Sequence, residues 1–166
     1  MLIREIKLDD YKKYLDLRNQ VDSESEFMLY DPGERKLTYD QQKNIIQNYL
    51  FSLNSTIFVA ELDGRLVGYL EVQGGTLKKI RHKIFIVVGI LKEFTNNGIG
   101  TKLFEALNDW VPQRGIHRIE LLYRDGNEIG RHLYEKMGFV EEARLKDVYF
   151  FDGRFFDEVR MCRIMS

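Results

Sequence analysis

The sequence predicts an α+β domain built around one mixed, mostly antiparallel β-sheet. Three observations support this fold class. Two Asp-Gly pairs, Asp63-Gly64 and Asp152-Gly153, each lie between segments with strand-like patterns, which is typical of two-residue hairpins. The apolar run from Ile84 to Leu91 is followed by a polar turn, and then by a helical repeat of apolar residues from Ile99 to Trp110.

The N-terminal third predicts a strand, two helices and an irregular segment between them. Residues Leu2 to Lys7 alternate apolar and charged and indicate the first strand. An apolar stripe from Tyr11 to Val21 follows two aspartates and indicates a helix. The segment from Asp22 to Leu37 has no periodicity. Thr38 and Gln41 have the spacing of a capping box, which begins a helix that ends near Leu53.

The remaining elements alternate strands with two further helices. The expected strands are Thr56 to Leu62, Arg65 to Gln73, about Ile80 to Leu91, His117 to Tyr123, Phe139 to Phe150 and Arg154 to Ile164. One expected helix begins at Gly98 and is closed by Gly115. The other begins at Glu128 and ends at Met137. This gives about seven strands and about four helices in one chain.

Size and composition set limits on the function. At 166 residues the natural count is one domain, residues 1–166. The 25 basic and 26 acidic residues nearly cancel, which argues against nucleic acid or an anionic membrane as the main partner. The charged start argues against a secretory signal, and no apolar run approaches a membrane span. One cysteine, Cys162, allows no internal disulfide and fits a cytoplasmic protein. The three histidines are not spaced as metal ligands, so we expect no metal.

The central turn is the best candidate for a binding motif. Asn96, Asn97, Gly98 and Gly100 tolerate positive φ or allow a close approach to the backbone. The first amides of the following helix lack internal partners and attract anions, so the turn suits a phosphate group. The alternative is a purely structural strand-to-helix turn. The turn lacks the Gly-Lys-Ser/Thr of a phosphate-binding loop and the third glycine of a dinucleotide fingerprint.

Two motifs and the element order resemble the GNAT N-acetyltransferases over essentially the whole chain. Thr95-Asn96-Asn97-Gly98-Ile99-Gly100 is similar to the Gln/Arg-x-x-Gly-x-Gly/Ala motif of that family, with Thr95 departing from the usual residue. The segment from Asn127 to Phe139 is similar to Asn-x-x-Ala-x-x-Leu-Tyr-x-x-x-Gly-Phe, with Gly130 in place of alanine. The resemblance implies an α/β/α layered fold with splayed central strands. It also implies acetyl-CoA as co-substrate and transfer of its acetyl group to a primary amine by direct attack.

The resemblance also implies where acetyl-CoA binds. Pantetheine would pair with backbone groups around Val88 and Ile90, with Gly89 between them suited to a β-bulge or a close approach. The pyrophosphate would lie on the amides of Asn96 to Thr101, and Lys102 could supply a positive charge. The cofactor-binding residues implied are Val88, Gly89, Ile90, Thr95, Asn96, Asn97, Gly98, Ile99, Gly100, Thr101, Asn127 and Tyr134.

Tyr134 occupies the position of the family's general acid. A phenol can donate a proton to the leaving thiolate, although a packed aromatic side chain is the alternative. Asn127 would orient the cofactor, and it is also a good N-cap for the helix that begins at Glu128. A backbone N–H near Ile90 would polarise the carbonyl oxygen.

The residues that bind and deprotonate the amine are less well defined by the sequence. Glu71 in the third strand, His82 in the fourth, or a chain of waters are the candidates for the base. In the irregular segment, Glu24, Glu26, Phe27 and Tyr30 could form an acidic and aromatic site for a cationic amine. The alternative for this segment is a solvated loop that covers the core.

Two other classes of function remain open at this stage. The same fold could serve as a non-catalytic acyl-CoA-binding or sensor module, or as an interaction domain in which the turn is only structural. Asn127 and Tyr134 favour the enzyme, and Thr95 is the feature that leans towards the sensor. The acceptor would be a small molecule or a protein N-terminus. A homodimer through the last strands is compatible with the resemblance, because members of the family often dimerise.

Overall fold

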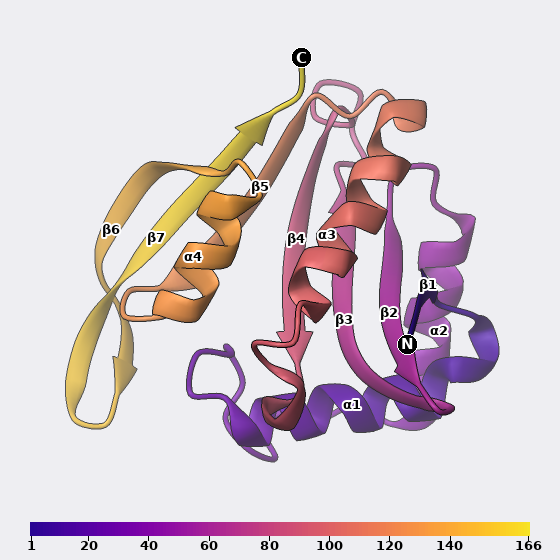
Figure 1. Cartoon of the computed structure of the whole chain (residues 1–166), viewed down its shortest axis with the longest axis horizontal. Helices are drawn as coiled ribbons and strands as arrows, with labels where there is room; N and C mark the ends of the chain where they lie inside the picture. Colours follow the sequence, from indigo (N-terminus) through magenta and orange to yellow (C-terminus); the bar gives the residue numbers. More distant parts are fainter.

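The computed structural model describes residues 1–166 and contains seven strands and four α-helices (Figure 1). The strands are β1 (Leu2–Glu5), β2 (Thr56–Leu62), β3 (Arg65–Gly74), β4 (Lys83–Ile90), β5 (Arg118–Arg124), β6 (Val140–Phe151) and β7 (Arg154–Ile164). The helices are α1 (Tyr11–Glu24), α2 (Tyr39–Phe51), α3 (Ile99–Trp110) and α4 (Glu128–Lys136), with short 3₁₀ turns at η1 (Leu8–Asp10), η2 (Lys92–Phe94) and η3 (Val111–Arg114).

All seven strands belong to one sheet in the order β1-β2-β3-β4-β5-β7-β6. Every neighbouring pair is antiparallel except β4 and β5, which are parallel. The prediction of a mixed, mostly antiparallel sheet is therefore confirmed. A parallel pair needs a crossover connection, and α3 supplies it between β4 and β5.

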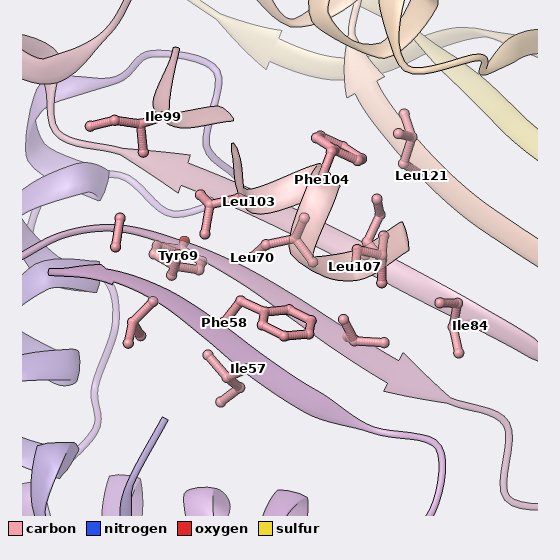
Figure 2. Close-up of a cluster of buried hydrophobic side chains, with 14 of the residues drawn as sticks. Ile57, Phe58, Tyr69, Leu70, Ile84, Ile99, Leu103, Phe104, Leu107 and Leu121 are labelled. Atoms are coloured by element: carbon pink, nitrogen blue, oxygen red, sulfur yellow. The ribbon is translucent and has the colours of Figure 1, made fainter. Parts of the chain in front are cut away.

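Helices cover both faces of the sheet. On one face the ring of Tyr69 in β3 packs edge-on against Tyr14 of α1, with ring centroids 5.5 Å apart. On the other face Phe58 of β2 meets Trp110 of α3 at 6.4 Å. Figure 2 shows α3 side chains packed over these strands. Neighbouring residues of a strand point to opposite faces, so α1 and α2 form one layer and α3 the other, as the layered prediction requires.

Local sequence signals account for the ends of several elements. The Thr38 side chain accepts from the Gln41 N–H, and the Gln41 side chain accepts from the Thr38 N–H, so the capping box is confirmed. Both residues of the Asp63-Gly64 turn have positive φ, as does the Asp152-Gly153 turn. Positive φ at both central residues is the type I′ geometry that fits the twist of two antiparallel strands.

The prediction was wrong about where the fourth strand begins. We expected a strand from about Ile80, but β4 begins at Lys83 and the residues before it form a turn. The backbone of this turn is satisfied locally, because Ile80 donates to the Leu77 carbonyl and Lys83 donates to the Ile80 carbonyl. The Asn54 side chain donates to the carbonyls of Gly75 and Arg81 and holds the turn in place.

No helix of the structure has both the length and the apolar character to cross a membrane.

Candidate active site

The sheet opens between β4 and β5. Their register contains only three residue pairs, of which the last is Phe85 with Glu120, so the strands separate beyond that point. The Leu91 N–H donates to the Val67 carbonyl of β3. Because N–H groups alternate between the two sides of a strand, those of Val88 and Ile90 face the opening. The predicted splay of the central strands is present.

Gly89 allows a close approach, but not by way of a bulge. The register of β3 and β4 has no shift, and Gly89 lies opposite Tyr69. A β-carbon on Gly89 would come 2.4 Å from Cε1 of the Tyr69 ring. The expected β-bulge is therefore wrong, and glycine is required because the buried Tyr69 ring covers this position.

The turn that follows β4 presents free backbone donors. Asn96 and Gly98 have φ values of 62° and 78°, which turn the chain into α3. The amides from Asn96 to Thr101 donate no hydrogen bond within the protein. They lie at the positive end of the α3 dipole, a combination that suits a phosphate or pyrophosphate.

A cavity of about 320 Å³ lies beside this turn. It is lined by Ile90, Phe94, Thr95, Asn96, Gly98, Ile99, Gly100, Thr101, Ile129, His132, Leu133 and Lys136. Seven of the twelve expected cofactor residues are among them. The other five are not: Val88, Gly89, Asn97, Asn127 and Tyr134. Sequence reasoning missed His132 and Lys136, although their spacing of four residues places them on one face of α4.

Lys136, rather than Lys102, is the cation at the cavity. Its Nζ atom donates to Thr101 Oγ1 at 3.2 Å, and Lys102 does not line the cavity. Gly100 explains how α4 comes this close to α3. A β-carbon on Gly100 would lie 2.7 Å from Cδ2 of Leu133, so the absence of a side chain lets the two helices pack.

Tyr134 lies in an aromatic cluster of α4. Its ring is 5.8 Å from Tyr123, 6.1 Å from Phe104 and 6.4 Å from Phe139, and 9 % of the residue is exposed. Burial, with a smaller contribution from Tyr123, raises the pKa of Tyr134 to about 12. The hydroxyl therefore keeps its proton at neutral pH. It makes no hydrogen bond within the protein, unlike the hydroxyls of Tyr14 and Tyr49.

Asn127 is the N-cap of α4. Its Oδ1 atom accepts from the Gly130 N–H at 3.0 Å. A β-carbon on Gly130 would lie 2.7 Å from Asn127 Nδ2, which accounts for glycine where the related motif has alanine. The capping role is thus established by geometry, and the cofactor-orienting role remains a prediction.

Glu71 lies on the α1–α2 face of β3 in a buried polar cluster. The residue is 6 % exposed, and its carboxylate accepts from the Tyr14 hydroxyl at 3.1 Å, from Gln73 Nε2 at 2.9 Å and from the Tyr49 hydroxyl. The Arg18 guanidinium is 3.8 Å away. The residue lies opposite Val87 of β4 in the sheet register, close to the opening.

A second cavity, of about 530 Å³, begins at Glu71. Its lining residues come from α1, the segment between α1 and α2, α2 itself and β3: Arg18, Tyr30, Glu34, Arg35, Lys36, Leu37, Ile45, Tyr49, Glu71 and Gln73. The cavity is therefore on the face of the sheet opposite α3. The first cavity contacts β4 at Ile90, and the second contacts the neighbouring strand β3 from the other face of the sheet.

His82 does not join either group. It lies in the exposed turn before β4, where its ring centroid is 6.3 Å from that of His117. Eight residues of extended chain, about 26 Å at ~3.3 Å per residue, separate it from Ile90. Contrary to the sequence prediction, it is not in the fourth strand, and it lies at the opposite end of β4 from the opening.

The expected acidic and aromatic group is divided by the structure. Tyr30 lines the Glu71 cavity, where the Arg35 guanidinium lies 4.1 Å from its ring centroid. Glu26 and Phe27 instead contact Arg124 at the end of β5. Glu24 accepts from the Lys92 N–H at 2.7 Å and joins the end of α1 to the segment after β4. The carboxylates of Glu24 and Glu26 thus already have partners.

Comparison with known proteins identifies the family. The model of the acetyltransferase (GNAT) family matches residues 18–139, which include the opened strands, the turn and α4. The chain belongs to this family. The prediction from the two motifs is confirmed.

Similar proteins cover most of the chain. A crystal structure of a GNAT acetyltransferase from Streptococcus pneumoniae superposes with a TM-score of 0.95 at 28 % identity, over 99 % of both chains. Spermidine N(1)-acetyltransferase of Escherichia coli is 23 % identical over 150 residues, 89 % of this chain and 80 % of that protein. An N-alpha-acetyltransferase of Sulfurisphaera tokodaii is 32 % identical over 118 residues, 63 % of this chain and 68 % of that protein.

The residues of the opening fit acetyl-CoA, the co-substrate of GNAT acetyltransferases. Free amides from Asn96 to Thr101 and the Lys136 ammonium suit the pyrophosphate, and the unpaired edge of β4 suits an amide-bearing chain. A structure of yncA from Salmonella typhimurium, with the same fold at a TM-score of 0.87, contains acetyl-CoA. The protein is an acetyl-CoA-dependent N-acetyltransferase, and the enzyme is favoured over the sensor module.

Proposed function

We propose that the protein acetylates a primary amine of a small molecule or a protein N-terminus while both substrates are bound. One observation carries this proposal. A cavity with free amides and a lysine contacts the opened strand β4, and the neighbouring strand β3 carries a cavity with a buried carboxylate on the other face of the sheet. Such an arrangement brings a thioester and an amine together from opposite faces of the sheet, which removes most of the entropic cost of their encounter.

The cofactor end binds through its backbone. Acetyl-CoA supplies an acetyl group activated as a thioester. The amides from Asn96 to Thr101 would hold the pyrophosphate, with Lys136 adding one positive charge. The backbone groups of Val88 and Ile90 would hold the pantetheine amides. The Ile90 N–H would polarise the carbonyl oxygen as negative charge develops on it. Asn127 would help to orient acetyl-CoA by holding the N-terminus of α4, which it caps.

Tyr134 is the general acid in this proposal. As the nitrogen–carbon bond forms and the carbon–sulfur bond breaks, its hydroxyl would donate a proton to the departing sulfur. The raised pKa keeps the hydroxyl protonated, and the hydroxyl has no competing partner within the protein. The free, protonated hydroxyl supports a donor role, although the raised pKa makes it a weaker acid than an ordinary tyrosine.

Glu71 is the preferred base, acting directly or through water. The buried carboxylate lies beside the opening and lines the cavity through which an amine would enter. Its three hydrogen bonds fix its orientation. His82, at the far end of β4, is not retained as a candidate. Tyr30 would contact the acceptor from the cavity wall, and Glu26 and Phe27 would contact it from the side of β5.

Thiol release from acetyl-CoA across a panel of amines tests this proposal. The panel contains α-amino acids, their carboxamides, spermidine and short peptides with free N-termini. We expect at least one amine to drive release, and Tyr134→Phe to lower kcat by about tenfold or more with little change in acetyl-CoA binding. The matched control is Tyr39→Phe, which removes an exposed hydroxyl bonded to Asp16. Binding of acetyl-CoA without turnover of any amine would contradict the proposal.

A further inference from the structure

Arg124, the last residue of β5, is a buried cation with few partners. The residue is 7 % exposed, and only its Nη2 atom makes a hydrogen bond, to Glu26 Oε1 at 3.2 Å. Its Nε and Nη1 atoms are buried without any partner. The Glu26 side chain is 50 % exposed. A guanidinium has five N–H donors, so most of the hydrogen-bonding capacity of Arg124 is unused.

Three phenylalanine rings surround this guanidinium. Its central carbon lies 4.2 Å from the ring centroid of Phe156, 4.5 Å from Phe27 and 5.1 Å from Phe151. The rings come from β6, β7 and the segment after α1. Aromatic faces stabilise a cation partly, but they leave its N–H groups without acceptors, and such burial is costly. The site is therefore built to hold a charged donor in a dry environment.

The position of Arg124 relates it to the acceptor. Tyr123 points towards Tyr134 of α4, so the neighbouring Arg124 points to the opposite face of the sheet, which the α1–α2 segment covers. Glu71 is on this same face, in β3. β5 is unpaired with β4 at this point. Figure 1 shows the chain that follows α1 between the β6–β7 hairpin and the lower end of β4. Arg124 and Glu71 thus lie on the same face of the sheet, on strands to either side of β4 and its opening, and Arg124 itself is buried beneath the segment that follows α1.

We propose that Arg124 binds a carboxylate carried by the acceptor, so that the substrate is an amine with a nearby carboxylate, such as an α-amino acid. This inference rests on the proposed function and narrows it. The acceptor carboxylate takes the position of the Glu26 carboxylate. At present Glu26, whose side chain is 50 % exposed, forms a single ion pair with the Arg124 guanidinium. A bidentate pair would use the Nη1 and Nη2 donors together and would gain strength from the aromatic surroundings.

Charge explains why this differs from a site for polyamines. The Glu26 carboxylate faces a cation and is not free to attract a second one. The Asp22 carboxylate is likewise bound to Arg35 at 2.7 Å. An acceptor with several positive charges would place one of them near Arg124, and like charges in a dry site repel strongly. A zwitterion instead matches the cation on β5 and leaves its amine for the base.

The experiment compares kcat/KM for L-amino acids, their carboxamides and spermidine in the full chain, with acetyl-CoA saturating. We expect at least one amino acid to exceed its carboxamide by about tenfold to a hundredfold, the effect of one charge-assisted pair. Arg124→Gln should remove this preference, and Arg124→Lys should retain part of it. Glu26→Gln should lower KM for the amino acid without changing KM for acetyl-CoA. Arg154→Gln, a change of a nearby arginine whose guanidinium is 5.4 Å from the Phe156 ring, is the matched control and should keep the preference.

Three results would overturn the inference. Equal kcat/KM for amino acids and carboxamides, or a higher value for spermidine, excludes carboxylate recognition while leaving the acetyltransferase activity established. An equal fall for all acceptors in Arg124→Gln, with their ratio unchanged, assigns Arg124 to the structure of the α1–α2 segment. If Arg124→Gln does not fold, the other two variants test the inference. An unchanged ratio of kcat/KM for amino acid to carboxamide in both Arg124→Lys and Glu26→Gln would exclude carboxylate binding by Arg124. Turnover of no amine at all contradicts the proposed function itself.

Discussion

The two ends of the opening are built from different parts of the chain. The cofactor end is made mainly of backbone: consecutive amides after β4, the free edge of β4 itself, and glycines that permit the turn and the helix contact. The proposed acceptor end is made of side chains from distant segments, with Glu71 on β3, Tyr49 on α2 and Arg124 on β5. Backbone donors exist whatever the side chains are. This difference explains how one fold can keep its acyl donor while its loops select different acceptors.

The largest expected effect is at the acceptor end. In Glu71→Gln the amide nitrogen would meet hydroxyls that now donate to a carboxylate, and the Arg18 cation would lose its buried counter-ion. We expect kcat/KM to fall about a hundredfold or more and the free energy of unfolding to fall by about 2 to 3 kcal/mol.

Acetyl-CoA binding separates this effect from unfolding. Its Kd, measured by titration, should change little in Glu71→Gln, because Glu71 does not line the cofactor cavity. The control Glu61→Gln changes a carboxylate bonded to Arg4 on the β1–β2 pair, away from the site, and should keep full activity. A loss of acetyl-CoA binding equal to the loss of activity would mean that the two ends are not separable.

The next effect tests the packing below the cofactor strand. In Gly89→Ala the new methyl group would enter the space of the Tyr69 ring, which is buried and cannot move aside. We expect a loss of about 1 to 3 kcal/mol in stability, typical of overpacking, together with weaker acetyl-CoA binding. Chemical denaturation measures the first and titration the second. Restored stability in the double variant Gly89→Ala/Tyr69→Leu would identify the ring as the cause, and no change in either quantity for Gly89→Ala would contradict the geometry.

Alkaline unfolding tests the environment of Tyr134. Its pKa is about 12 when folded, against an ordinary value of 10.0, so the folded state keeps its proton longer than the unfolded state. The protonated Tyr134 hydroxyl therefore contributes to the free energy of unfolding in full below about pH 10. This contribution falls as the pH rises, and about 2 kcal/mol of it is lost at pH 12. The unfolding free energy of Tyr134→Phe should therefore fall less steeply between pH 10 and 12 than that of the wild type. Parallel curves would mean that the Tyr134 hydroxyl is solvated.

The smallest effect concerns the charge at the cofactor end. Lys136 is exposed and adds one cation beside six free amides, so Lys136→Gln should raise the Kd of acetyl-CoA by about threefold to tenfold, more at low salt than at high salt. Lys102→Gln is the matched control and should leave Kd unchanged, because Lys102 does not line the cavity. Equal effects of the two changes would indicate only a general positive potential.

Features that depend on residues close in sequence could be predicted, whereas contacts between distant segments could not. The turn with Gly98 and the cap at Asn127 depend on residues a few positions apart, so both were correctly interpreted from sequence, as were the hairpins. Lys136 was missed because its contact with Thr101 depends on how α4 packs on α3. His82 was misassigned because Asn54, distant in sequence, holds the turn before β4. Contacts of this kind have no local pattern.

The partners of Glu26 illustrate the same limit. A carboxylate among aromatic residues in an irregular segment suggests a site for a cation. The structure brings Arg124, 98 positions away in the chain, into contact with it. A sequence pattern shows which charges are present, but it does not show which of them are already paired.

The three residue pairs that join β4 to β5 also affect how the protein responds to its co-substrate. The two parts of the sheet, β1 to β4 and β5 to β7, share one hydrophobic core through α3, but their strands are joined by these three pairs alone. A molecule that bridges the opening binds the folded state alone, and at a hundredfold excess over its Kd it adds about 2.7 kcal/mol to the unfolding free energy. Acetyl-CoA would thus act as a structural brace, and the cellular lifetime of the protein would follow the supply of its acyl donor.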